Sequence, residues 1–246
     1  MKAEEIIVYM ESLRDDEQRL VLMSFFKTAP GEYAEGDEFL GIKVPQTREV
    51  VKHTWQNLPL CEVPHLLMSR WHEVRLCGLL IMVEKFERAS TKRLANDPEA
   101  RRQREEILAM YLHYAHRANN WDLVDMSAPK ILGRWIVMEG GDETLIDALA
   151  SSPDLWRQRI SMVCTLTTSQ AGDPSWCLRM AERHLHHPHD LMHKAVGWML
   201  REMGKRVGMD FLRDFLRQHI HEMHRTTLRY AIEKMSNDER HYWMTL

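Results

Sequence analysis

Glycine and proline are scarce in this chain of 246 residues, which has only 11 Gly and 9 Pro. Each makes up roughly 4% of the chain, against a usual ~7% and ~5%, so collagen-like, linker-rich and turn-rich all-β folds are excluded. No apolar stretch approaches the ~20 residues of a membrane span. The N-terminal segment Met1–Met10 is acidic where a secretion signal would be basic. We therefore expect a cytoplasmic protein that is not bound to a membrane.

Paired cysteines and standard catalytic motifs are also missing. The four cysteines form no C-x-x-C pair, and three lie in apolar stretches, which predicts reduced and mostly buried thiols. The chain has no phosphate-binding glycine loop, no dinucleotide fingerprint, no serine-hydrolase elbow and no H-E-x-x-H. The histidines between His184 and His189 flank Pro188 with a spacing that suits no structural zinc site, so we expect a solvated loop there. No metal and no cofactor are predicted.

Apolar residues recur with a period near 3.6 along almost the whole chain, which predicts an all-α fold. The segment Glu4–Lys27 follows this spacing throughout. Pro45 stands where a helix would begin, and Asp97-Pro98 and Ser236-Asn-Asp-Glu239 have the form of helix starts. The segment Pro30–Asp37 is the one clear turn-rich loop.

Four polar residues recur at nearly equal spacing, each before an apolar helical stretch. Asp125, Arg159, Lys194 and Arg229 are separated by 34, 35 and 35 positions, and His72-Glu-Val-Arg75 resembles an earlier copy. A period in this range, with about two helices per unit, is typical of an α-solenoid, in which the recurring residues would line one concave surface. The alternative is a chance recurrence in unrelated helices. No boundary is visible, so we predict a single domain over residues 1–246.

Two helical segments combine tryptophan with charge. Trp121 and Asp125 are four residues apart and so share a helix face, where a ring and a carboxylate could hold a sugar or base and stabilise a cation. The alternative is a core tryptophan beside a capping aspartate. A second face carries Lys194, Trp198, Arg201 and Lys205, a basic stripe with an aromatic ring that suits a nucleic-acid backbone, or else a merely solvated face. Arg157 and Arg159, next to Trp156, could both hold phosphate oxygens.

With these motifs the chain resembles the AlkD family of bacterial DNA alkylation-repair glycosylases, from about residue 20 to 235. The resemblance rests on Phe39-Leu-Gly-Ile-Lys-Val-Pro45, Trp121-Asp-Leu-Val-Asp125, Trp156-Arg-Gln-Arg159 and, most specifically, Lys194-Ala-Val-Gly-Trp-Met-Leu-Arg-Glu202. It implies tandem HEAT-like helical repeats with a concave groove that binds duplex DNA. It also implies excision of cationic N3- and N7-alkylpurines without base flipping.

The resemblance also implies roles for particular residues. Asp125 would stabilise the oxocarbenium-like sugar and position water, and Trp121 and Trp198 would pack against the lesion deoxyribose. Arg159 and Arg201 would hold phosphates. A base that already carries positive charge leaves without a general acid, so one positioned carboxylate is chemically sufficient.

The chain departs from the family pattern in two places. The loop Pro30–Glu38 is longer and more acidic than expected. Phe25 or Phe26 stands where a tyrosine is expected, so we expect no tyrosine hydroxyl near the lesion.

Net charge alone argues against DNA binding, because the chain carries −3. The charge is uneven: residues 1–150 carry 19 basic and 25 acidic side chains, a net of −6, and residues 151–246 carry 14 and 11, a net of +3. Arg159, Lys194, Arg201 and Arg229 all lie in the positive part. We expect salt-sensitive binding of alkylated duplex DNA by a monomer associated with the bacterial nucleoid. A DNA-binding solenoid without catalysis and a protein-binding scaffold are the alternatives.

Overall fold

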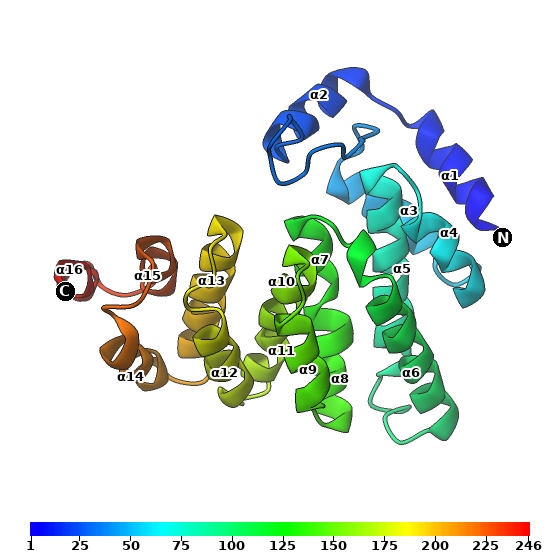
Figure 1. Cartoon of the computed structure of the whole chain (residues 1–246). Coiled ribbons are helices and arrows are strands. Elements are labelled where there is room, and N and C mark those ends of the chain that lie inside the picture. Colours follow the sequence, from blue (N-terminus) through cyan, green and yellow to red (C-terminus); the bar gives the residue numbers. More distant parts are fainter. The chain divides into compact units, whose positions relative to one another are not determined.

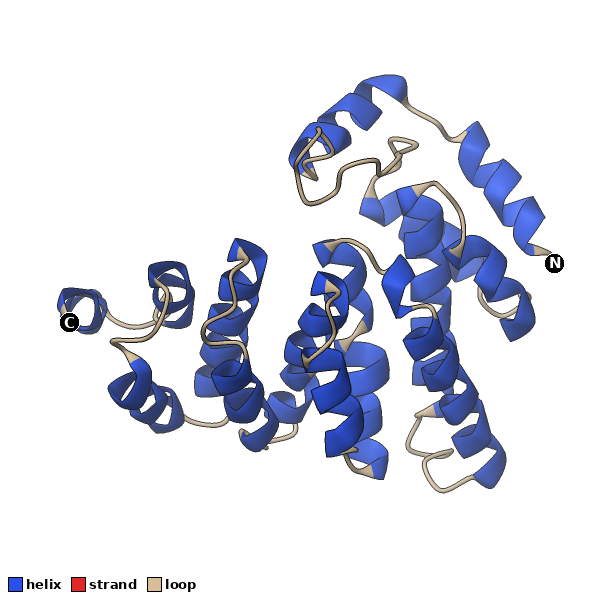
Figure 2. Ribbon diagram, in the orientation of Figure 1, coloured by secondary structure: helices blue, strands red, loops and turns tan.

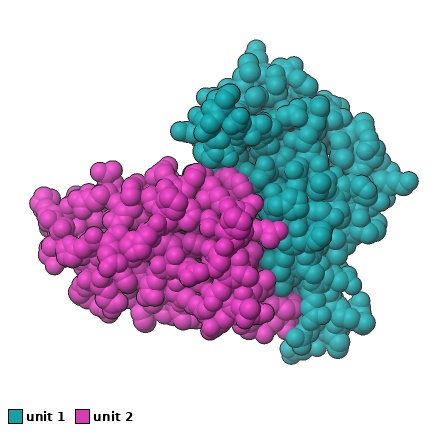
Figure 3. Space-filling model, in the orientation of Figure 1, with its two compact units in different colours: residues 1–127 teal, residues 128–246 magenta.

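The computed structural model describes all 246 residues, and helices joined by loops make up the chain (Figures 1 and 2). The only β-type pairing is an isolated bridge between Glu38 and Trp71. The all-α prediction is therefore confirmed. The chain divides into two compact units, Met1–Ser127 and Ala128–Leu246 (Figure 3). The single-domain interpretation stays a prediction. No helix is both long enough and apolar enough to span a membrane.

Unit 1 is organised around its longest helix, α5, against which α3, α4, α6 and α7 all pack. A buried apolar row along α5, from Leu76 to Phe86, forms the centre of its core. The helices of this unit are α1 (Ala3–Ser12), α2 (Asp16–Phe25), α3 (Val44–Thr54), η1 (Leu60–Glu62), α4 (Val63–Leu67), α5 (His72–Ala89), α6 (Pro98–His113), η2 (Ala115–Arg117) and α7 (Trp121–Ser127).

Unit 2 stacks helical repeats, as an α-solenoid does. Helices α10, α13 and α15 pack one after another, while α9 packs on α10 and both α12 and α14 pack on α13. The helices of this unit are η3 (Pro129–Gly133), α8 (Arg134–Glu139), α9 (Glu143–Ala150), α10 (Leu155–Val163), α11 (Thr165–Gln170), α12 (Ser175–Arg183), α13 (Asp190–Arg206), α14 (Met209–His219), α15 (Arg225–Ala231) and α16 (Asn237–Thr245).

The repeat is visible at the helix starts as well as in the polar residues. Asp154, His189 and His224 each accept a hydrogen bond from the backbone of the helix that follows, α10, α13 and α15 respectively. Their positions are 35 residues apart, as are those of Arg159, Lys194 and Arg229 on the same three helices. Asp97 and Ser236 cap α6 and α16, and Pro45 lies in the first turn of α3, as predicted.

The segment Glu4–Lys27, predicted to be helical, contains two helices. The helical spacing over Glu4–Lys27 is divided between α1 and α2, because the chain turns at Leu13–Asp15. The Asp15 side chain caps α2 by accepting from the Gln18 amide, and the Asp15 amide donates to the Leu40 carbonyl at 3.0 Å. A contact from outside the segment thus fixes the break.

The motif Phe39–Pro45 has a structural role. The buried Glu73 carboxylate accepts hydrogen bonds from the amides of Leu40, Gly41 and Ile42 at 2.8–3.1 Å. Gly41 has φ +92°, and a Cβ there would lie 2.1 Å from the Asp15 carbonyl oxygen. Only glycine allows the two backbone segments to approach so closely. The motif therefore connects three parts of unit 1: helix α2, helix α5 and the loop that precedes α3.

The cysteines are free, as expected, and three of them are buried: Cys77, Cys164 and Cys177. Burial raises the pKa of the Cys77 and Cys177 thiols to about 12. Cys61 is exposed.

Candidate active site

Trp121 opens α7 at the end of unit 1 and is enclosed by aromatic rings. Its backbone amide is capped by the side-chain oxygen of Asn120 at 2.8 Å. Its indole stacks on Phe26, with ring centroids 5.3 Å apart, and meets the edge of Phe25 at 5.9 Å. The indole is nevertheless partly exposed. Trp121 is therefore a ring held in place but still accessible, rather than a core tryptophan.

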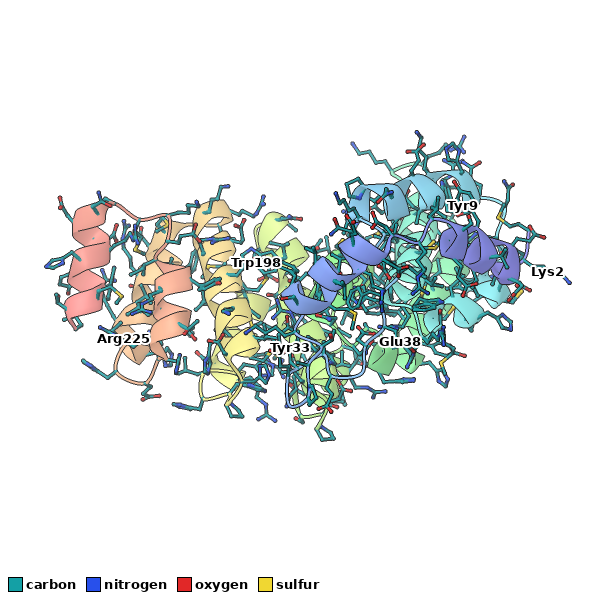
Figure 4. The ribbon with its side chains drawn as sticks, turned by 90° about the horizontal axis from the view of Figure 1, so that it is seen from above. Lys2, Tyr9, Tyr33, Glu38, Trp198 and Arg225 are labelled. Carbon is teal, nitrogen blue, oxygen red and sulfur yellow. The ribbon has the colours of Figure 1, made fainter.

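A tyrosine hydroxyl lies beside this ring, contrary to the sequence-based expectation. The indole Nε1 of Trp121 donates to the hydroxyl of Tyr33 at 3.3 Å. Tyr33 lies on the loop between α2 and α3, together with Glu38 (Figure 4). The loop Pro30–Glu38 thus supplies a hydroxyl to Trp121. The tyrosine that carries it lies eight residues after Phe25 in the sequence.

Asp125 follows Trp121 by one helical turn on α7, as the spacing predicts, and is half-buried. Carboxylate and indole therefore share one face of a short helix. The next residue, Met126, contacts the Arg48 guanidinium through its sulfur at 3.7 Å.

A buried ionic bridge holds α7 against the loop and α5. His72 is bonded through Nδ1 to Asp37 and through Nε2 to Asp122, both at 2.9 Å. Arg75 donates to the other oxygen of Asp37. All four side chains are almost fully buried. Two carboxylates balance two cations, which is the arrangement that makes buried charge tolerable.

The bridge requires a protonated imidazole, because both ring nitrogens face carboxylates. Burial alone would lower the pKa of His72, but the charges and hydrogen bonds of Asp122 and Asp37 outweigh it and raise the pKa to about 9. Burial would likewise raise the pKa of Asp37, yet His72 and Arg75 hold it below its usual range. The imidazole ring also stacks on Phe39 and lies against Phe26, which itself stacks on Trp121.

The predicted basic stripe lies along α13 in unit 2, with Trp198 partly exposed (Figure 4). Lys194 pairs with Asp190 of its own helix at 2.7 Å. Arg201 pairs with Glu233 and Glu202 and is 16% exposed, while Lys205 is exposed. The positive charge of the stripe is therefore partly neutralised within the protein.

The glycine of the Lys194–Glu202 motif is required for packing. A Cβ on Gly197 would lie 2.4 Å from the Thr227 carbonyl oxygen and 2.5 Å from Cβ of Tyr230. Gly197 thus allows α13 and α15 to approach closely.

The remaining predicted phosphate ligands differ in exposure. Arg159 is only 4% exposed and donates to the Leu191 carbonyl at 2.6 Å, where α13 begins. Arg157 is half-buried. Arg229 is exposed and lines a hollow of about 470 Å³ together with Arg240 and His241. Arg229 is therefore accessible to a ligand, whereas Arg159 packs α10 against α13.

Of the four histidines in the predicted solvated loop His184–His189, His184 is buried, His187 and His189 are half-buried and His186 is exposed. His184 is 3% exposed and bonded to the Ser161 hydroxyl at 2.9 Å. His187 is bonded to Gln158, and His189 caps α13 through Nδ1. Burial, and secondarily the charges of His187 and Arg183, lower the pKa of His184 to about 4. The expectation of solvated side chains is therefore wrong for His184, whereas His186 is exposed as expected.

The sequence predicts the shared helix face of Trp121 and Asp125, but no motif predicts that Tyr33, Asp37, His72 and Asp122 lie beside it. The four missed residues come from three separate segments, so no local spacing joins them. One signal was present: His72, Glu73 and Arg75 place three ionisable groups in one turn of an otherwise apolar helix.

Comparison with known proteins places the chain in a family. Residues 6–235 match the family described as DNA alkylation repair enzyme. The chain belongs to this family. A solved structure titled "Predicted DNA alkylation repair enzyme from Enterococcus faecalis" superposes with a TM-score of 0.69, covering 91% of this chain and 97% of that one. Its sequence identity is 16%, so the likeness to it concerns the fold alone. No curated protein matches the chain significantly.

Proposed function

We propose that this protein is a DNA glycosylase that hydrolyses the N-glycosidic bond of cationic N3- and N7-alkylpurines in duplex DNA. Membership of the DNA alkylation repair family supports a repair role. The observation that carries the proposal is the shared face of Trp121 and Asp125 on α7, with the indole accessible yet held by Phe26 and Tyr33. The protein would work as a cytoplasmic monomer without a metal or cofactor.

The chemistry requires little beyond a fixed negative charge. An alkylated purine carries a positive charge that makes it a good leaving group, so the difficult step is the developing charge on the deoxyribose. A carboxylate held in place before the reaction stabilises that charge without reorganisation. Asp125 would supply the carboxylate and orient water, Trp121 and Trp198 would pack on the sugar, and the cations of α13 and α15 would hold phosphates.

The direct test measures release of 7-methylguanine and 3-methyladenine from methylated duplex DNA in single-turnover reactions. Asp125→Asn keeps the size of the side chain but removes its charge, so the rate should fall by about 10²–10³-fold. Asp238→Asn is the matched control, because Asp238 is an exposed aspartate of α16. Wild-type protein that binds methylated duplex but releases no base at any excess would make it a non-catalytic DNA-binding protein.

A further inference from the structure

Unit 1 carries a second basic surface, along α3 and α5. Two adjoining hollows are both lined by Trp55. The larger, of about 400 Å³, is also lined by Lys85 and Arg88. The smaller, of about 230 Å³, is also lined by Arg48 and Lys52. We propose that this Trp55 surface, formed by Arg48, Lys52, Trp55, Lys85 and Arg88, binds the phosphate backbone of duplex DNA. The proposal rests on the proposed function for the identity of the polyanion.

Unpaired charge distinguishes this surface. Arg48, Lys85 and Arg88 form no ion pair with any carboxylate, and the one side-chain hydrogen bond of Arg48 is to the sulfur of Met126. Lys52 pairs with Glu49 at 3.3 Å, but both are well exposed, so the pair is weak. Glu84, in the smaller hollow, is the only acidic residue that lines either one. By contrast, Lys194 and Arg201 of α13 are both engaged by carboxylates.

The partial burial of Lys85 points in the same direction. Burial lowers the pKa of Lys85, and no carboxylate opposes that effect. A half-desolvated cation without a partner is unfavourable until an anion reaches it. Lysine and arginine beside an accessible indole are the groups that bind a nucleic-acid backbone, since the cations neutralise phosphates and the ring packs on sugar or base.

The surface is continuous with the candidate active site. Arg48 lines the smaller hollow and also touches Met126, the residue that follows Asp125. A backbone seated along α3 and α5 would therefore reach α7 within the same unit. The acidic net charge of residues 1–150 does not oppose this, because close cations act more strongly than the distant total.

The test is binding of an unmodified, fluorescently labelled duplex, measured by anisotropy at several salt concentrations. Each lost phosphate contact should reduce the slope of log Kd against log salt by about one. Lys85→Gln combined with Arg88→Gln should therefore lower the slope by about two and weaken binding at low salt by about tenfold or more. Arg48→Gln should lower it by about one.

The matched control is Arg101→Gln combined with Arg102→Gln, which removes the same charge from exposed arginines of α6 that line neither hollow. The control should leave the slope nearly unchanged. Equal slopes for the Lys85/Arg88 variant and wild type, with both folded by circular dichroism, would overturn the proposal. Binding to unmodified DNA requires no base release, so a wild type that shows the expected slopes but no glycosylase activity would refute the proposed function alone.

Discussion

Trp121 is held mainly by residues that lie far from it in the sequence. Phe26 stacks on its face, Phe25 meets its edge, and Tyr33 accepts from its indole nitrogen. The first two contacts fix the plane of the ring, and the third fixes its rotation within that plane. A hydrogen bond of this kind contributes about 1 kcal/mol, enough to bias the ring toward one orientation.

At this scale we predict that Tyr33→Phe slows base release without unfolding the protein. The phenyl ring is kept and only the hydroxyl is lost, so about 1 kcal/mol of positioning should disappear and the single-turnover rate should fall about fivefold. Tyr9→Phe, which removes an exposed hydroxyl from α1, is the control and should react as wild type does. Equal rates for Tyr33→Phe and wild type would show that the hydroxyl does not position Trp121.

At the scale of helices, the close packing of α13 on α15 depends on Gly197. We predict that Gly197→Ala destabilises the protein by about 1–3 kcal/mol, because the added methyl group would overlap the Thr227 carbonyl oxygen and Cβ of Tyr230. Urea denaturation measures the loss. Gly208→Ala is the control: Gly208 has an extended φ of 165° and its nearest new contact would be an ordinary 3.5 Å. Similar losses for the two variants would show that the helix contact is not the cause.

The helices were predictable where local chemistry decides them and not where a distant contact does. The starts of α3, α6 and α16 follow from Pro45, Asp97 and Ser236. The break between α1 and α2 was not predictable, because the Leu40 carbonyl that accepts from the Asp15 amide lies elsewhere in the chain. The acidic loop was predictable as a loop, but its Asp37 points into a buried bridge rather than to solvent.

For the whole molecule too, features that follow a sequence period were predictable and features that depend on distant contacts were not. The 35-residue period predicted the stacking of unit 2, and the spacing of Trp121 and Asp125 predicted their shared helix face. The bridge of Asp37, His72 and Asp122 joins residues 35 and 50 positions apart, which no helical period relates. The unpaired cations around Trp55 could not be predicted from the net charge, because the net charge says nothing of where the charged side chains lie.

We expect the two units to respond to pH in opposite directions, because each buries a histidine whose pKa is shifted in a different direction. His72 in unit 1 has its pKa raised from 6.5 to about 9, so its contribution is complete below pH 6.5 and is lost as the pH rises through 9. His184 in unit 2 has its pKa lowered from 6.5 to about 4, so its contribution is complete above pH 6.5 and is lost as the pH falls toward 4. Each shift corresponds to about 3 kcal/mol.

We therefore predict that unit 1 opens first in alkali and unit 2 first in acid. Buried thiols report on each unit separately: Cys77 on unit 1, and Cys164 and Cys177 on unit 2, with the exposed Cys61 as an internal standard. Pulse labelling with a methanethiosulfonate reagent in moderate urea should modify Cys77 faster, relative to Cys61, at pH 9 than at pH 6.5. At pH 5 the labelling of Cys164 and Cys177, again relative to Cys61, should increase instead.

His72→Gln should remove most of the alkaline response and leave the acid response, and His184→Gln should do the reverse. An alkaline response that persists in His72→Gln would mean that another group titrates, since the bridge no longer carries a proton in that variant.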